Sequence, residues 1–193
     1  MSPSMTPEEV LAALEEAGAV LRGHFRLTSG RHSDRYVQCA RILEDPALVS
    51  RLADAMVAAV EEERIDMVAA PAVGAVIIGF AVARSLGVRF VFTERQAGVM
   101  TLRRGFVVPE GARVLVVEDV VTTGGSVAEV VELVRAAGGV PVAVASIIDR
   151  GGLKAFDVPL HALLALPVES WDADRCELCA AGSPILSPGS RAL

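Results

Sequence analysis

The most constraining feature of this sequence is residues 114–126, which read VLVVEDVVTTGGS. Their first four residues are apolar and mostly β-branched, which is typical of a strand buried on both faces of a parallel sheet. Two carboxylates, Glu118 and Asp119, follow where that strand is expected to end, and the apolar spacing over 127–137 predicts a helix. Strand, turn and helix together predict an open α/β fold, in which ligands bind at the carboxyl ends of the strands.

The turn between this strand and this helix has the composition of a phosphate cradle. Glycines allow close backbone approach, and the free N–H groups at a helix start, together with hydroxyl side chains, bind anions. The P-loop pattern and the three spaced glycines of the dinucleotide fingerprint are both absent. The two acids suit sugar hydroxyls and repel a phosphate chain, so a ribose 5′-phosphate fits. The predicted cradle consists of Val120, Val121, Thr122, Thr123, Gly124, Gly125 and Ser126.

The run EDVVTTGGS resembles the signature of the type I phosphoribosyltransferases, which bind phosphoribosyl pyrophosphate (PRPP). The resemblance implies one α/β domain over 1–193, with a central, mostly parallel sheet flanked by helices. It also implies a hood over the base site at 1–44, a mobile catalytic loop at 94–105 and a C-terminal tail at 171–193. The alternative is a chance strand, turn and helix with acids on the surface.

A second motif, near the amino terminus, bears on the base. From Phe25 to Tyr36 the chain follows F-x-L-x-S-G-x-x-S-x-x-Y, which resembles the hood of orotate phosphoribosyltransferases. Ser29 and Gly30 are therefore expected to contact orotate. Without the resemblance, the segment predicts a two-stranded hairpin whose second strand is 36–39. A purine phosphoribosyltransferase and a PRPP-sensing regulator without catalysis are the alternative functions.

Another basic residue is predicted on the ligand side of the sheet. Residues 142–148 predict a buried strand that ends in Asp149 and Arg150. A guanidinium fork recognises planar groups such as the carboxylate and imide edge of orotate in two contacts. The resemblance implies that this Asp-Arg pair binds orotate, with Thr122 as a further contact. An ordinary salt bridge is the alternative role of Arg150.

Residues 93–105, after a predicted strand at 88–92, are too polar and too long for a tight hairpin, and loops of this length are usually functional. The resemblance implies a flexible catalytic loop that closes over PRPP and often reaches into the neighbouring subunit of a homodimer. Arg95 and either Arg103 or Arg104 are expected to neutralise the departing pyrophosphate. The alternative is a solvated basic hairpin tip.

The expected reaction joins a ring nitrogen of orotate to C1 of the ribose and expels pyrophosphate, giving orotidine 5′-monophosphate. Glu118 and Asp119 are expected to favour the positive charge that develops on the ribose. Mg²⁺ is expected to bind mainly through PRPP and pyrophosphate, and no residue is assigned as a direct metal ligand.

The chain departs from the better-studied bacterial branch of this family at three places. Lysines of that branch are replaced here by Thr28, by Gly74 and in the region of Gly98, and Lys154 is the only lysine of the chain. We therefore expect one of the two neighbouring loop arginines to take over the charge.

The other segments alternate between helix and strand. A capping box of Thr6 and Glu9 predicts a helix over 7–17, and an Asp-Pro pair predicts one over 46–64. Residues 67–70 predict a short buried strand, followed by a small-residue loop at 71–75 and an apolar helix to residue 86. The resemblance implies that this loop binds pyrophosphate, and a plain turn is the alternative. Residues 153–166 predict one or two edge strands.

Bulk properties exclude several partners. The formal net charge of −6 argues against a nucleic-acid surface, and no apolar run approaches the ~20 residues of a membrane span. A cytoplasmic protein with reduced thiols is expected. Cys176 and Cys179 form one C-x-x-C, at most half of a zinc site, which His161 and Cys39 would complete only by accident of folding.

Overall fold

The computed structural model describes residues 5–27 and 29–187. Predictions that fall on Thr28 and on residues 188–193 therefore lie outside the described residues. The strands are β1 (Val20–Arg26), β2 (His32–Val37), β3 (Met67–Pro71), β4 (Arg89–Gln96), β5 (Val99–Leu102), β6 (Arg113–Val121), β7 (Val140–Asp149) and β8 (Leu160–Ala165). The helices are α1 (Pro7–Glu16), α2 (Pro46–Ala59), α3 (Val76–Leu86), α4 (Gly125–Ala136) and α5 (Glu177–Ala180), with 3₁₀ turns η1 (Cys39–Glu44) and η2 (Ala173–Arg175).

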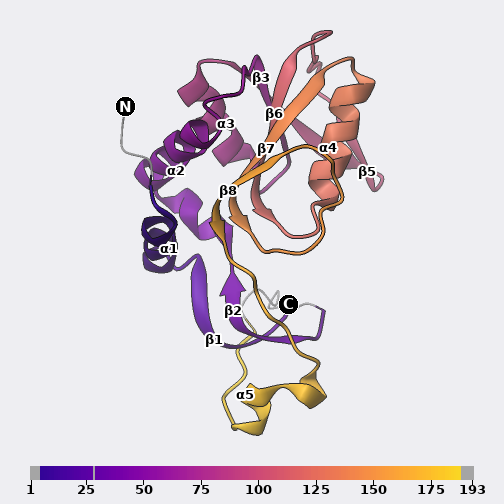
Figure 1. Cartoon of the computed structure of the whole chain (residues 1–193). Helices are drawn as coiled ribbons and strands as arrows, with labels where there is room; N and C mark the ends of the chain where they lie inside the picture. Colours follow the sequence, from indigo (N-terminus) through magenta and orange to yellow (C-terminus); the bar gives the residue numbers. More distant parts are fainter. Residues whose placement is uncertain (1–4, 28, 188–193) are drawn as a thin grey trace.

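The main sheet has six strands in the order β5-β4-β3-β6-β7-β8. Neighbouring strands are parallel except β4 and β5, which run antiparallel at one edge. Figure 1 shows α1, α2 and α3 on one side of this sheet and α4 on the other. The expected α/β fold with a mostly parallel, helix-flanked sheet is confirmed.

Strand β6 supplies both layers of the core because successive side chains of a strand point to opposite faces. Leu115 and Val117 pack with the α1, α2 and α3 side of the sheet, whereas Val114 and Val116 pack with the α4 side. All four are fully buried. The continuous apolar run of this strand therefore reflects burial on both faces, as the sequence predicted.

The helices α1 and α2 begin where the sequence predicts, but α2 ends earlier than predicted. The hydroxyl of Thr6 accepts from the Glu9 amide, and the Glu9 carboxylate accepts from the Thr6 amide, so the capping box is present. Helix α2 ends at Ala59 and not near residue 64. Three glutamates follow at 61–63, and negative charge is unfavourable at a helix carboxyl end.

The predicted long loop at 93–105 is wrong, because most of it forms a hairpin. Strands β4 and β5 pair from Thr93 with Leu102 to Gln96 with Val99. The two turn residues between them, Ala97 and Gly98, have φ of 50° and 85°, as a type I′ turn requires. The hairpin agrees with the alternative of a basic hairpin tip. A loop was preferred because alanine is uncommon at φ > 0 and because Glu94, Arg95 and Gln96 before the turn are polar.

A small lobe stands away from the main sheet. It contains the antiparallel pair β1 and β2 and the C-terminal segment that carries α5 (Figure 1). His32 and Trp171 exchange two backbone hydrogen bonds of 2.8 Å, and Leu186 bonds to both His24 and Arg26. The hairpin was predicted, although its second strand begins at residue 32 and not at 36. Among the described residues, no helix is long and apolar enough to cross a membrane.

Candidate active site

The predicted phosphate cradle lies between the end of β6 and the start of α4. Helix α4 begins at Gly125, so its free N–H groups open onto a cleft of about 270 Å³. Gly124 caps this helix with φ of 76°, and a Cβ there would come within 2.4 Å of the Phe156 ring. Only glycine fits this position. The cleft is lined by Arg95, Glu118, Val120, Val121, Thr122, Thr123, Gly124, Gly125, Ser126, Val127 and Glu129.

The acidic pair lies within β6 and not after it. Strand β6 continues to Val121, which pairs with Asp149 of β7, so Glu118 and Asp119 have strand geometry. Burial, and then the charge of Asp119, raise the pKa of Glu118. A ligand that donates hydrogen bonds or carries positive charge would therefore favour the ionised form of Glu118.

The small-residue loop after β3 approaches this acidic pair. A Cβ on Gly74 would lie 2.9 Å from Oδ2 of Asp119, so a larger residue there would displace the carboxylate. Gly74 is one of the places where the resemblance leads one to expect lysine. The structure thus offers a physical reason for glycine: the loop backbone packs against Asp119 directly.

A second, larger cleft of about 670 Å³ joins the hood to the carboxyl ends of β6 and β7. Thr122 and Thr123 line both clefts, so the two spaces adjoin at the cradle. Of the predicted orotate contacts, Ser29, Thr122 and Arg150 line the larger cleft, and Gly30 does not. The lining is Arg26, Leu27, Ser29, Arg35, Tyr36, Val37, Thr122, Thr123, Arg150 and Gly151.

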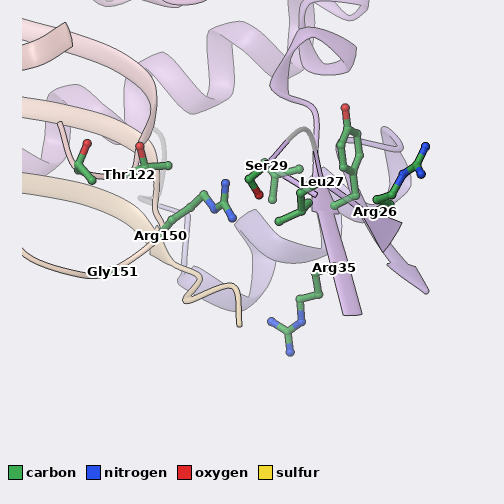
Figure 2. A pocket seen from close by; sticks show the side chains of 10 residues that line it. Arg26, Leu27, Ser29, Arg35, Thr122, Arg150 and Gly151 are labelled. Atoms are coloured by element: carbon green, nitrogen blue, oxygen red, sulfur yellow. The ribbon is translucent and has the colours of Figure 1, made fainter. Parts of the chain in front are cut away.

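Arg150 extends from the end of β7 toward Ser29 and Leu27 of the hood (Figure 2). Its backbone N–H donates to Val121 at 2.9 Å, which fixes its position beside β6. Its buried Nε has no hydrogen-bond partner among residues 5–27 and 29–187, and burial lowers its pKa. An unpaired buried donor is unfavourable, so this guanidinium is set up to receive an anionic or carbonyl ligand.

Within residues 5–27 and 29–187 Arg150 forms no salt bridge, and the neighbouring Asp149 pairs with another residue. Oδ1 of Asp149 lies 2.5 Å from Nζ of Lys154, which also donates to the carbonyl oxygens of Thr122 (3.0 Å) and Gly151 (2.8 Å). Lys154 therefore joins the ends of β6 and β7 beneath the larger cleft. Sequence reasoning assigned it no role, although its being the only lysine was a signal.

Sequence reasoning also missed three hood residues, Arg26, Arg35 and Tyr36, as lining of the larger cleft. Their position could have been predicted from the sequence, because Arg26 and Arg35 are basic residues beside the F-x-L-x-S-G motif in a chain of negative net charge.

The three predicted loop arginines differ in their contacts. Arg95 lines the cradle cleft and makes a two-bond ion pair with Glu129 (2.9 and 2.7 Å). Arg104 makes a similar pair with Glu94 (2.9 and 2.8 Å) and lies over the Phe92 ring. Arg103 is exposed and forms no ion pair within the described part of the chain. Neither Arg103 nor Arg104 lines either cleft.

Cys39 is buried close to the acids and away from the other thiols. Burial, then the charges of Asp119 and Glu118, raise the pKa of its thiol. The raised pKa favours the protonated thiol of Cys39.

Comparison with known proteins adds independent findings. The family model of the phosphoribosyl transferase domain matches residues 38–158. The chain is 52% identical to an orotate phosphoribosyltransferase of Acidithiobacillus ferrooxidans, over 98% of this chain and 100% of the relative. It is 48% identical to one of Desulforamulus reducens, over 97% and 98% of the two chains. The crystal structure of orotate phosphoribosyltransferase from Aeropyrum pernix superimposes with a TM-score of 0.72 and 28% identity, over 81% of this chain and 93% of that one.

Proposed function

This chain belongs to the phosphoribosyltransferase family, and within it to the orotate phosphoribosyltransferases, and on that premise we propose its reaction. It transfers the phosphoribosyl group of PRPP to orotate and produces orotidine 5′-monophosphate and pyrophosphate in pyrimidine biosynthesis. The observation that carries the proposal is the buried Nε of Arg150, which has no hydrogen-bond partner in the described part of the chain and belongs to a side chain that faces the hood in a cleft adjoining a phosphate cradle.

Orotate occupies the larger cleft in this proposal. Its carboxylate and imide edge match the two-pronged geometry of a guanidinium, and they would satisfy the Nε of Arg150. Ser29, Gly30 and Thr122 complete the predicted contacts. A purine lacks the carboxylate, so Arg150 would stay unpaired beside it, which favours orotate over the purine alternative.

The phosphoribosyl group lies across the two clefts. Its 5′-phosphate accepts hydrogen bonds from the amides at the start of α4 and from the hydroxyls of Thr122, Thr123 and Ser126. Its ribose hydroxyls donate to Glu118 and Asp119. As the bond from C1 to pyrophosphate breaks, positive charge grows on the ribose, and these carboxylates stabilise it.

The departing pyrophosphate needs positive charge around it. Glu118 lines the cradle cleft and Asp119 follows it in β6; both carry hard oxygen donors, so they fit a Mg²⁺ ion that arrives with PRPP, although Asp119 lines neither cleft. When bound, Mg²⁺ neutralises charge on the pyrophosphate oxygens. Arg95 and Arg103 supply the rest when the β4–β5 hairpin closes. Arg95 is retained because it already lines the cradle cleft, although it pairs with Glu129. Of the two neighbouring arginines, Arg103 is favoured because Arg104 pairs with Glu94.

We also propose that the protein is a homodimer with its contact on α3. Ile77 and Phe80 lie about one turn apart on α3 and are 48% and 58% exposed, and Val73, in the turn just before the helix, is 83% exposed. Large apolar side chains gathered on one helix face are typical of an interaction surface. A cytoplasmic location and the lack of nucleic-acid or membrane partners stay predictions.

The decisive experiment follows orotate absorbance with PRPP and Mg²⁺, beside parallel assays with uracil, adenine, guanine and hypoxanthine. Turnover of orotate much faster than that of uracil or any purine supports the proposal. Uracil is the sharpest comparison because it is orotate without the carboxylate that Arg150 would bind. Activity with a purine alone contradicts the base assignment. Heat protection by PRPP without any turnover would favour the regulator hypothesis.

A further inference from the structure

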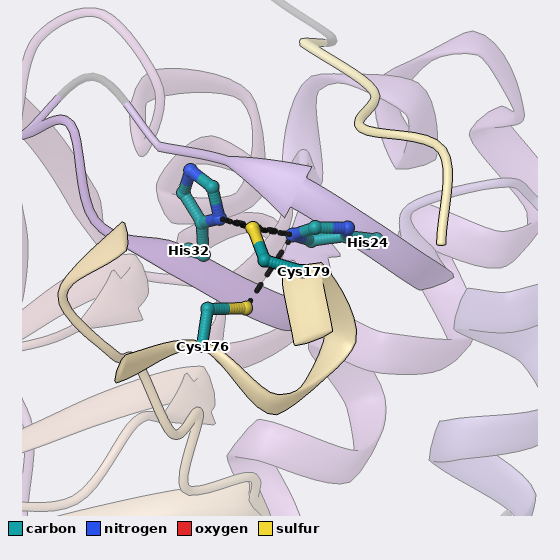
Figure 3. A group of neighbouring side chains, drawn as sticks. All are labelled: His24, His32, Cys176 and Cys179. Atoms are coloured by element: carbon teal, nitrogen blue, oxygen red, sulfur yellow. Dashed lines mark hydrogen bonds between the residues drawn. The ribbon is translucent and has the colours of Figure 1, made fainter. Parts of the chain in front are cut away.

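The small lobe contains a group of side chains to which the reaction assigns no role. Two histidines of the hairpin and two cysteines of the C-terminal segment converge there (Figure 3). We call them the hood cluster, and they are His24, His32, Cys176 and Cys179. Their four ligand atoms all lie within 4.8 Å of one another, although the two pairs are far apart in the sequence.

The separations within the hood cluster match a tetrahedral metal site. Zinc bonds of about 2.0–2.1 Å to nitrogen and 2.3 Å to sulfur imply nitrogen–sulfur separations of about 3.5 Å and nitrogen–nitrogen separations of about 3.3 Å. Nε2 of His24 lies 3.5 Å from Sγ of Cys176 and 3.7 Å from Sγ of Cys179. Nδ1 of His32 lies 3.2 Å from Sγ of Cys179 and 2.9 Å from Nε2 of His24. These four separations lie within about 0.4 Å of the tetrahedral values, and the remaining two, from Cys176 to Cys179 and to His32, are at most 4.8 Å.

Hydrogen bonding alone explains this convergence poorly. Nδ1 of His24 lies 2.9 Å from the carbonyl oxygen of Ser183, which only accepts, so Nδ1 carries the proton and Nε2 of the neutral ring has one lone pair. Three groups point at that lone pair: Nδ1 of His32 and the two thiols. One lone pair forms one good hydrogen bond, whereas a metal ion accommodates all four groups at once.

The surroundings of the hood cluster also suit a metal. His24, His32 and Cys176 are only 2%, 4% and 3% exposed. The bond from His24 to Ser183 is the outer contact that orients a ligating imidazole and fixes its tautomer. Two thiolates balance the charge of a divalent cation, and their protons leave to solvent on binding, so the buried site is neutral. Two sulfur and two nitrogen ligands in a tetrahedron are typical of zinc.

The position of the hood cluster indicates what the metal does. A two-stranded hairpin is marginally stable by itself, and the small lobe has little apolar core of its own. The histidines lie on β1 and β2, and the cysteines lie in the segment that wraps them. The same hairpin supplies Arg26, Arg35 and Tyr36 to the larger cleft.

We propose that the hood cluster is a structural Zn²⁺ site that fastens the C-terminal segment to the hood and holds the hood over the base cleft. Zinc binding by itself does not depend on the proposed reaction. The effect of zinc on the base does rest on it, because that effect is read through orotate.

The first test measures zinc directly in the full chain, purified under reducing conditions without chelator. Mass spectrometry of the metal content should find about one zinc per chain. The C179S and H32N variants should lose it. The chain supplies matched controls, since C39S and H161Q alter the remaining cysteine and histidine and should keep the zinc.

A second measurement uses the wild-type protein, so that a variant that fails to fold does not decide the outcome. Zinc is replaced by Co²⁺, and the absorption spectrum is recorded. Intense visible bands of tetrahedral cobalt and sulfur-to-cobalt charge transfer are expected. Protein that binds neither zinc nor cobalt overturns the proposal. So does zinc that persists in C179S and H32N, a different native metal, or a disulfide between Cys176 and Cys179 in the purified protein.

The functional test compares zinc-loaded protein with protein that has been stripped by a chelator, desalted and supplied with Mg²⁺. Loss of zinc should raise KM for orotate several-fold more than KM for PRPP, because the hood lines the base cleft and not the cradle. Equal effects on both substrates overturn the positioning role. A protein that holds one zinc per chain but does not turn over orotate refutes the proposed function and leaves the metal site intact.

Discussion

Replacing Arg150 with glutamine tests the proposed reaction most directly. Among the described residues the buried Nε of Arg150 has no hydrogen-bond partner, and the neighbouring Asp149 pairs with Lys154. Removal of the guanidinium should therefore cost the ligand-free protein little stability. We therefore expect R150Q to keep or slightly raise the melting temperature. A conventional buried ion pair would predict the opposite, because removal of one partner is strongly destabilising.

The magnitude of the catalytic loss follows from the contacts that Arg150 would make with orotate. Each hydrogen bond to a charged group contributes about 1.5–3 kcal/mol, and a guanidinium fork makes two. Arg150 is half-buried, so solvent screening favours the lower end, about 3 kcal/mol in total. Since 1.4 kcal/mol is a factor of ten, kcat/KM for orotate should fall about 100-fold.

The assay compares kcat/KM for orotate and for uracil in wild-type and R150Q proteins, with thermal unfolding measured beside it. The loss should be confined to orotate, because uracil lacks the carboxylate. R135Q is the matched control: it removes an exposed arginine that pairs with Glu132 and Asp157 on the outer side of α4. Equal losses for both bases, or a destabilised R150Q with normal orotate kinetics, would refute the reasoning.

Three further predictions concern the loop, the acids and the subunit contact. R103A should lower kcat about 100-fold, as loss of a charge that stabilises the transition state does, whereas R104A should mainly destabilise the hairpin. Steady-state kinetics and thermal unfolding distinguish these two effects. Unchanged turnover in R103A would contradict the assignment. Burial and the charge of Asp119 raise the pKa of Glu118 to about 9, so between about pH 5 and pH 9 the folded state binds more protons than the unfolded state. Stability should therefore fall as pH rises through this window, and E118Q should flatten the dependence in thermal scans. An equally steep profile in E118Q would assign the slope to another group. F80E should convert a dimer to a monomer by sedimentation, and an unchanged mass would remove α3 as the contact.

Local patterns decided most of the fold. The β-branched run of β6 has no polar side chain until Glu118, so it had to be buried on both faces, and that requires helices on both sides of a parallel sheet. Capping residues fixed the helix starts because a cap bonds to amides only two or three residues away. The hairpin of β4 and β5 was not predictable in this way, since Ala97 is an uncommon turn residue and the charged Arg95 favours the prediction of a loop.

The phosphate cradle is a property of the sequence alone, because its hydroxyls, glycines and helix start are contiguous between Val120 and Ser126. Contacts between distant segments needed the tertiary structure. Lys154 pairs with Asp149, and Nε of Arg150 has no partner within residues 5–27 and 29–187. His24 and His32 lie beside a C-x-x-C that follows them by more than half the chain. Sequence periodicity does not predict such long-range contacts, because they depend on how a hairpin and a C-terminal segment pack in space. The sequence determined the chemistry of the cradle, and the fold decided which side chains face the base and which gather around a metal.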